Sequence, residues 1–164
     1  MAVDRSVNAP YTQADAITKT VYYAGSDAVL EGEPFVYDVT NGTLTAPNGL
    51  RHNQVKRPTA SGEIFAGVAT RSYPAADPGN GRLIEIALPG SRGVRIRIAA
   101  AIDAGDRAQF CYKATTGSKL FKEVNTALTA VNIGCAVIRQ TVTAAGLVQA
   151  DLCDGSYNAG AAES

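Results

Sequence analysis

The chain has 164 residues, with 15 basic and 15 acidic side chains, so its formal charge is zero. A neutral chain does not suit a general nucleic-acid-binding protein, which needs a basic surface to neutralise phosphates. Charged residues make up 18% of the chain, fewer than the usual ~25%, and this weak surface repulsion favours a protein that works within an assembly. No apolar run reaches the ~18 residues of a transmembrane helix, and the first ten residues contain no apolar signal core. We therefore expect no membrane partner.

Residues 1–20 show no sustained hydrophobic periodicity, so we expect an extended N-terminal arm, with a frayed terminus as the alternative. From residue 21 onward, short runs rich in Val, Ile, Tyr and Thr alternate with Gly, Pro, Asn and Asp, which is typical of strands and turns. The predicted strands are 21–24, 35–39, 64–71, 83–88, 94–99, 108–113, 133–140 and 147–153. The best helical candidate, 123–131, is weakened by Asn and Thr residues. The sequence therefore predicts an all-β fold, a small β-barrel or sandwich.

Two stretches of the chain, 28–90 and 101–155, resemble each other. In each, a glycine turn is followed by an acidic residue and then by a strand that ends in tyrosine. The corresponding positions are Gly32 and Gly105, Glu33 and Asp106, Tyr37 and Tyr112, Gly67 and Gly134, and Gly81 and Gly146. Neither half could bury its apolar faces alone. We therefore predict two pseudo-repeated halves that close around one core, forming a single domain over 21–155, followed by a C-terminal tail, 156–164.

Residues 83–98 predict a β-hairpin, because Pro89, Gly90 and Gly93 bracket a turn between two alternating apolar runs. With Leu88 opposite Val94, the isoleucines of both strands share the core face. The same register places Glu85 opposite Arg97 on the other face. That face is either solvated or a basic stripe that meets a partner protein, formed by Arg92, Arg95 and Arg97.

The halves differ between residues 45 and 63, where the first contains a long segment of low apolar content. Four groups there can carry positive charge: Arg51, His52, Lys56 and Arg57. A structureless loop of this length in a compact domain is usually functional or disordered. We expect either a solvated loop or a contact with a partner, for which Arg51, Lys56 and Arg57 are free.

Signatures of enzymatic chemistry are missing. The only histidine is His52, and the three cysteines (Cys111, Cys135 and Cys153) are far apart within apolar runs, so we expect buried free thiols in a reducing cytoplasm. There is no nucleophile elbow and no phosphate-binding loop. Acidic pairs flank the glycine turns at equivalent places in both halves, which suits turn capping better than glycoside hydrolysis or calcium binding. We expect no enzyme, catalytic residue, cofactor or metal site.

The string GRLIEIALPGSRGVRIRIAAAIDAGDRAQFCY, with the glycine-containing strands GVAT and IGCAVI and the closing GLVQADLCDG, resembles the capsid decoration (cement) proteins of tailed bacteriophages over roughly residues 28–155. The resemblance implies a β-barrel protein, made in the host cytoplasm, that binds the outer surface of the virion as a homotrimer or cluster. It implies that the protein stabilises the shell by bridging major capsid protein subunits, without nucleic-acid or membrane partners. The candidate capsid contacts are Arg51, His52, Lys56, Arg57, Arg92, Arg95 and Arg97.

The alternative is a free-standing β binding module, either carbohydrate-binding or associated with a tail or fibre. A carbohydrate-binding module needs an exposed aromatic platform, whereas this chain has no tryptophan and only 7% aromatic residues. The two functions differ in assembly state, because a cement protein should accompany a capsid in near-stoichiometric copies.

Overall fold

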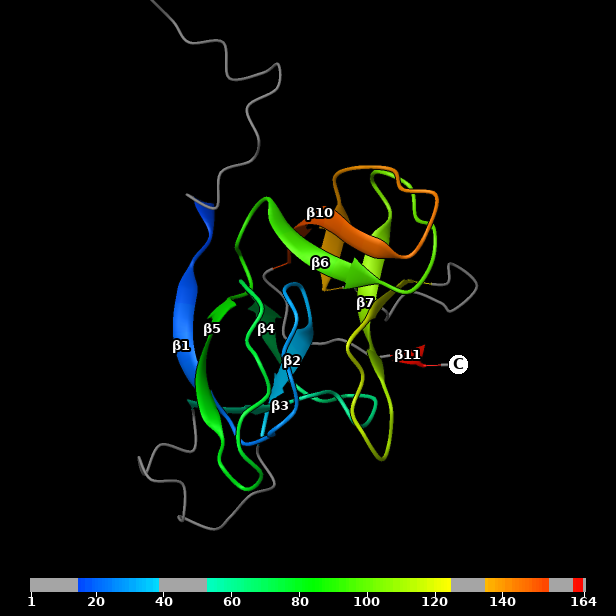
Figure 1. The fold of residues 1–164 in the computed structure, drawn as a ribbon. Helices are drawn as coiled ribbons and strands as arrows, with labels where there is room; N and C mark the ends of the chain where they lie inside the picture. Colours follow the sequence, from blue (N-terminus) through cyan, green and yellow to red (C-terminus); the bar gives the residue numbers. More distant parts are fainter. Residues whose placement is uncertain (1–14, 39–52, 125–134, 154–160, 164) are drawn as a thin grey trace, which may run out of the picture.

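A computed structural model describes residues 15–38, 53–124, 135–153 and 161–163 (Figure 1). Within these residues every regular element is a strand, which confirms the all-β prediction, and no helix is long and apolar enough to span a membrane. The strands are β1 (Thr18–Tyr23), β2 (Pro34–Tyr37), β3 (Gln54–Lys56), β4 (Phe65–Ala69), β5 (Arg82–Ala87), β6 (Val94–Ile98), β7 (Arg107–Tyr112), β8 (Phe121–Glu123), β9 (Ala136–Ile138), β10 (Gly146–Leu152) and β11 (Ala161–Ala162).

The strands form two closed barrels. The first has the order β1-β3-β2-β4-β5 and closes by pairing of β5 with β1. The second has the order β7-β8-β6-β10-β9 and closes by pairing of β9 with β7. Strand β11 pairs with β7 in parallel. Figure 1 shows the first barrel at the lower left and the second at the upper right. Each barrel contains one parallel pair, β1–β3 or β6–β8, while the other pairs are antiparallel. This matching order confirms the predicted duplication.

The hydrogen bonds at the two glycine turns define which residues correspond. Gly32 N donates to Ala69 O at 2.9 Å, and Gly105 N donates to Ile138 O at 2.8 Å. In return, Ala69 N donates to Glu33 O at 3.0 Å, and Ile138 N to Asp106 O at 2.8 Å. The predicted equivalence of these turns, each a glycine followed by an acid, is therefore correct.

Other predicted equivalences shift. Tyr37 pairs with Val55 and Phe110 pairs with Phe121, so the counterpart of Tyr37 is Phe110 and not Tyr112. Gly146 pairs with Ile98 as Arg82 pairs with Tyr23, so Gly146 corresponds to Arg82 and not to Gly81. Gly134 lies outside the described residues. Glycines that serve turns locally do not fix a register, which depends on strand pairing over many residues.

The predicted hairpin over residues 83–98 is wrong. Strand β5 pairs with β1 and β4, and Glu85 lies opposite Thr20. Strand β6 pairs with β10, and Arg97 lies opposite Leu147. The predicted faces are nevertheless correct, because Val94, Ile96 and Ile98 are buried while Arg95 is exposed. Alternation along a strand fixes its inner face but not its partner strand.

Residues 88–93 form a linker between the barrels instead of a hairpin turn. Leu88 N donates to Ile17 O at 2.8 Å, beside the start of β1. Gly90 N donates to Leu152 O at 3.0 Å, and Leu152 N donates to Ser91 O at 2.8 Å, at the end of β10. The linker is therefore held by the first strand of one barrel and the last strand of the other.

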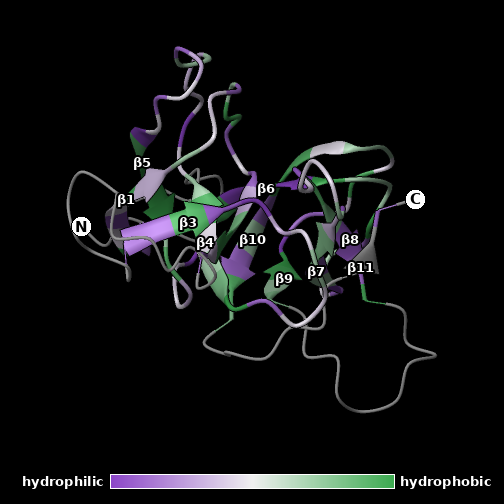
Figure 2. Cartoon of the chain, turned by 90° about the horizontal axis from the view of Figure 1, so that it is seen from below, coloured by the Kyte–Doolittle hydropathy of each residue, from purple (hydrophilic) through white to green (hydrophobic). Residues whose placement is uncertain are grey.

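Each barrel encloses its own apolar interior, which corrects the prediction of one common core. Barrel one is filled by a cluster that includes Val21, Phe35, Val55, Ile84 and Ile86. The cluster of barrel two also takes in four residues on the outside of barrel one: Val36, Phe65, Val68 and Ala87. The ring of Phe65 lies 6.2 Å from that of Phe110 and 6.0 Å from that of Phe121. Figure 2 shows the two barrels side by side, with hydrophobic and hydrophilic residues interspersed along their strands.

Three short strands were not predicted. Strand β3 lies within the segment 45–63, β8 begins at Phe121, and β11 falls in the predicted tail. Of the predicted N-terminal arm, residues 1–14 lie outside the described residues, and residues 18–20 are the first half of β1.

Candidate functional site: the cleft between the barrels

Of the seven basic residues predicted as partner contacts, the five that the structure describes do not form one surface. Arg51 and His52 lie outside the described residues. Lys56, at the end of β3, makes an ion pair with Glu63 at 2.7 Å and is 27% exposed. Arg57 follows it directly and is only 4% exposed. The expectation that Arg57 is free for a partner is therefore wrong, because its guanidinium group is used inside the protein.

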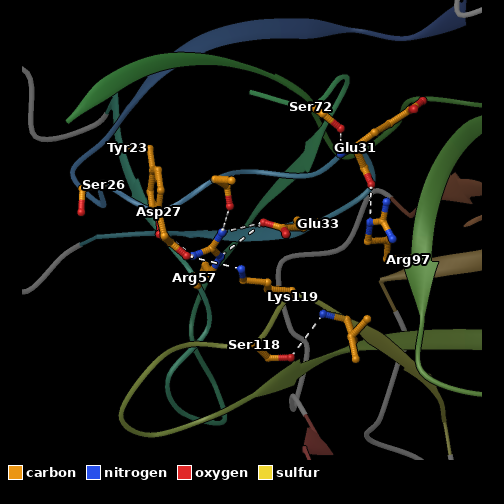
Figure 3. A network of polar contacts seen from close by, with 12 residues as sticks. Tyr23, Ser26, Asp27, Glu31, Glu33, Arg57, Ser72, Arg97, Ser118 and Lys119 are labelled. Carbon is orange, nitrogen blue, oxygen red and sulfur yellow. Dashed lines mark hydrogen bonds and ion pairs between the residues drawn. The ribbon is translucent and has the colours of Figure 1, made fainter. Parts of the chain in front are cut away.

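Arg57 is the centre of a buried polar network (Figure 3). Its Nη2 donates to Glu33 Oε2 at 2.9 Å and to the carbonyl oxygen of Ala28 at 2.8 Å. Its Nη1 donates to Tyr23 Oη at 2.8 Å and also to Asp27. Because Glu33 is fully buried, its charge depends on Arg57 for compensation.

The network also perturbs its titratable members. Burial raises the pKa of the Tyr23 hydroxyl well above its usual value. Burial alone would raise the pKa of Asp27, but hydrogen bonds from Tyr23 and Arg57 outweigh it and lower that pKa. Tyr23 Oη donates to Asp27 Oδ1 at 2.8 Å, so the carboxylate form of Asp27 is favoured.

The turn between β7 and β8 docks on this network from barrel two. Lys119 Nζ lies 3.4 Å from Asp27 Oδ2. The backbone N–H groups of Lys113 and Ser118 both donate to Pro58 O, at 3.2 and 3.0 Å. Gly117, with φ of +70°, packs so closely that a Cβ there would lie 2.3 Å from the Cβ of Arg57. This contact joins the end of β3 to barrel two.

A second contact joins the turn before β2 to strand β6. Arg97 N donates to Gly32 O at 2.9 Å, and Arg97 Nε donates to Glu31 O at 2.9 Å. Arg95, 54% exposed, makes an ion pair with the Glu31 carboxylate at 3.0 Å. Two members of the predicted basic stripe thus hold the barrels together, while Arg92 is exposed within the linker.

An open cleft of about 400 Å³ is lined by residues of both contacts. Barrel one contributes Asp27 and Leu30. Glu163, next to β11, also lines the cleft, and barrel two contributes Arg97, Lys113, Thr116, Gly117, Lys119 and Leu120. Among the described residues, no group of three or more His, Cys, Asp or Glu side chains is placed to hold a metal ion. The charged and apolar side chains of the lining can bind a partner by charge and by apolar contact.

The lysines and Leu30 of the cleft were missed by sequence reasoning. Lys113 and Lys119 lie at either end of a Thr-Thr-Gly turn and carry no periodic signal. Leu30 precedes the glycine turn of barrel one, where the sequence shows only an apolar pair and gives no sign of a binding site. Only Arg97 was predicted, since it alternates with buried isoleucines.

The chain matches no protein-family model and no curated protein. Its fold is similar to that of the N base of the head fibre gp8.5 of bacteriophage phi29, known from a crystal structure. The TM-score is 0.53 at 9% sequence identity, and the match covers 85% of this chain and 98% of that chain. At this identity the likeness shows a common fold, and it extends over nearly all of the phage protein's chain.

Proposed function

We propose that this protein is a structural component of a tailed-phage virion, bound to the outer surface of the capsid. The observation that carries the proposal is the fold shared with a phage head-fibre base over 85% of the chain. The resemblance to capsid decoration proteins rests on sequence motifs and not on the fold, and it supports the same class of virion protein. In this role the protein stabilises the shell by bridging neighbouring major capsid protein subunits, as a homotrimer or comparable cluster.

The two-barrel architecture suits this task. Two barrels joined through apolar contacts and a tied linker present a broad, rigid body, which loses little conformational entropy on binding. A neutral chain with few charges does not repel neighbouring copies strongly.

A fibre-associated module is the second candidate, since the similar structure is itself the base of a head fibre. The two functions differ in copy number. A cement protein occupies equivalent positions over the whole shell, whereas a fibre base occupies only the positions at which fibres attach.

Co-sedimentation tests the proposal. Purified protein is mixed with shells assembled from the major capsid protein of the same phage, without this chain. We expect saturable binding and a higher melting temperature of the shell. The number of copies bound at saturation separates a cement protein from a fibre base. Shells that pellet without the protein, at every concentration tried, contradict both.

A further inference from the structure

We propose that the cleft between the barrels binds an acidic segment of the partner that carries a leucine or a similar aliphatic residue. A partner carboxylate pairs with Arg97 and Lys113, and the aliphatic side chain packs on Leu30 and Leu120. The identity of that partner as a capsid protein rests on the proposed function, whereas the chemistry of the cleft does not.

The charges of the cleft favour an anionic partner. Its lining contains three cations (Arg97, Lys113 and Lys119) and two carboxylates (Asp27 and Glu163). Asp27 is already bonded to Arg57, Tyr23 and Lys119. Within the described residues, Lys113 Nζ has no hydrogen-bond or ion-pair partner, and Arg97 uses only Nε, on Glu31 O. Two cationic groups with free donors therefore face a single uncommitted carboxylate, that of Glu163.

The apolar part of the cleft favours an aliphatic side chain. Leu30 is 39% exposed, one of only four large hydrophobic side chains exposed in the described part of the chain. Leu120 lies half-buried in the same lining. An exposed leucine gains free energy when a partner covers it. The combination of aliphatic and cationic groups therefore fits a segment in which leucine and acidic residues are neighbours.

The walls of the cleft are held in place before any partner binds. The turn of Gly117 is packed on Arg57, and its flanking N–H groups are bonded to Pro58 O. The opposite wall is fixed by the bond from Arg97 N to Gly32 O. A volume of about 400 Å³ at the junction of two bodies is typical of binding sites. Preorganised walls reduce the entropy lost on binding.

A peptide titration tests the chemistry without any shell. The probe is a capped hexapeptide, Asp-Leu-Glu-Asp-Leu-Glu, followed through the backbone amide signals of the ¹⁵N-labelled protein. We expect the signals of Leu30, Gly117 and Leu120 to shift. A peptide with lysine in place of every acid, and one with serine in place of both leucines, should bind more weakly. Absence of shifts at millimolar peptide, or equal shifts with the lysine peptide, overturns the proposal.

Two surface variants make the test specific. Lys113→Glu should weaken peptide binding about fivefold or more, since an opposite charge becomes a like charge at a partly exposed site. The matched control is Lys122→Glu, an exposed lysine on β8 outside the cleft lining, which should bind as the unchanged protein does. Equal affinities for the two variants contradict the proposal. Circular dichroism confirms that both remain folded.

The same variants separate this inference from the proposed function. If the unchanged protein sediments with shells and Lys113→Glu does so equally well, the cleft is not the shell contact and the inference fails alone. If the unchanged protein does not bind shells but binds the acidic peptide specifically, the proposed function fails and the cleft chemistry stands.

Discussion

Gly117 and Arg57 belong to different barrels, yet a methyl group on Gly117 would lie 2.3 Å from the Cβ of Arg57. No real pair of side chains packs at that distance. The backbone of the β7–β8 turn therefore lies directly against the end of β3, and the two barrels are fitted to each other at this point without an intervening side chain.

The first prediction tests this close approach. Gly117→Ala should destabilise the protein more than Gly105→Ala, although both glycines have positive φ, +70° and +93°. The left-handed backbone alone costs roughly 1–2 kcal/mol in each variant. Only Gly117 adds an overlap, at roughly 1–3 kcal/mol, because a Cβ at Gly105 meets nothing within 4 Å. Urea unfolding of the two variants measures the difference. Equal losses mean that the barrels are not in contact here.

The second prediction concerns adjacent residues with opposite surroundings. Arg57→Met should cost about 3–5 kcal/mol of unfolding free energy, because it leaves the buried Glu33 carboxylate uncompensated. Lys56→Met should cost about 1 kcal/mol or less, since its ion pair is partly exposed. Replacing Glu33 by leucine in the Arg57→Met variant should recover part of the loss. Chemical denaturation decides, and a larger loss for Lys56→Met contradicts the network.

The third prediction contrasts neighbours on β6. Ile96→Ala should cost about 2–5 kcal/mol, because it empties volume in the core of barrel two. Arg95→Ala should cost under ~1 kcal/mol, because its pair with Glu31 is exposed. Thermal unfolding monitored by circular dichroism gives both values. A reversed order would mean that the inner and outer faces of β6 are exchanged.

The fourth prediction is a loss of stability in acid. Hydrogen bonds from Tyr23 and Arg57 outweigh burial and lower the pKa of Asp27; those from Lys56, Thr59 and Ala60 do the same for Glu63. A carboxyl group whose pKa is lower in the folded state stabilises the fold above its unfolded pKa, about 3.9 for Asp and 4.3 for Glu. That contribution is lost as the pH falls through the folded value.

The unfolding midpoint in urea should therefore fall between pH 5 and the acid limit of the measurement, with the steepest change below about pH 4. A variant with Asp27→Asn and Glu63→Gln should show a shallower fall over the same interval, because neither group can take up a proton. An identical slope in both proteins assigns the acid sensitivity to other carboxyl groups.

The fifth prediction concerns the thiols. Burial raises the pKa of Cys111 to about 11, and it raises that of the fully buried Cys135 further. At pH 8 about one Cys111 thiol in a thousand is then ionised, and the thiolate is the reactive form. Iodoacetamide should leave both residues unlabelled in the folded protein and label them in urea, as measured by peptide mass spectrometry. Rapid labelling of Cys111 without urea contradicts its burial.

The sequence carries clear information about strands and faces, and little about pairing. Seven strands overlap predicted runs of Val, Ile, Phe and Tyr: β1, β2, β4, β5, β6, β7 and β10. An eighth strand, β9, lies inside the predicted range 133–140. Strands β3, β8 and β11 have only two or three residues, too few for a period to be visible.

The site was harder to predict, for a physical reason. The cleft exists only because the β7–β8 turn meets the end of β3, two segments about 60 residues apart. Arg57 illustrates the difficulty. In the sequence it lies among polar residues, which predicts an exposed cation in a loop. Its burial depends on Glu33, Tyr23 and Asp27, which approach it only when barrel one has closed.

The two barrels meet through unlike surfaces, although they are copies of one design. The turn of Gly32 is docked on β6, while a Cβ built at its counterpart Gly105 would meet nothing within 4 Å. Between separate molecules, a heterologous contact builds a ring where its rotation closes and an open filament where it does not. The side chains that make this contact are not repeated at the equivalent positions of the chain. Three residues secure the contact inside the molecule, and each has a counterpart where a further copy would attach. Ala104 corresponds to Glu31, Thr20 to Arg95, and Tyr22 to Arg97. Ala104 and Thr20 are neutral and cannot form the ion pair that Arg95 makes with Glu31, so a further copy could not repeat this contact with the same charges.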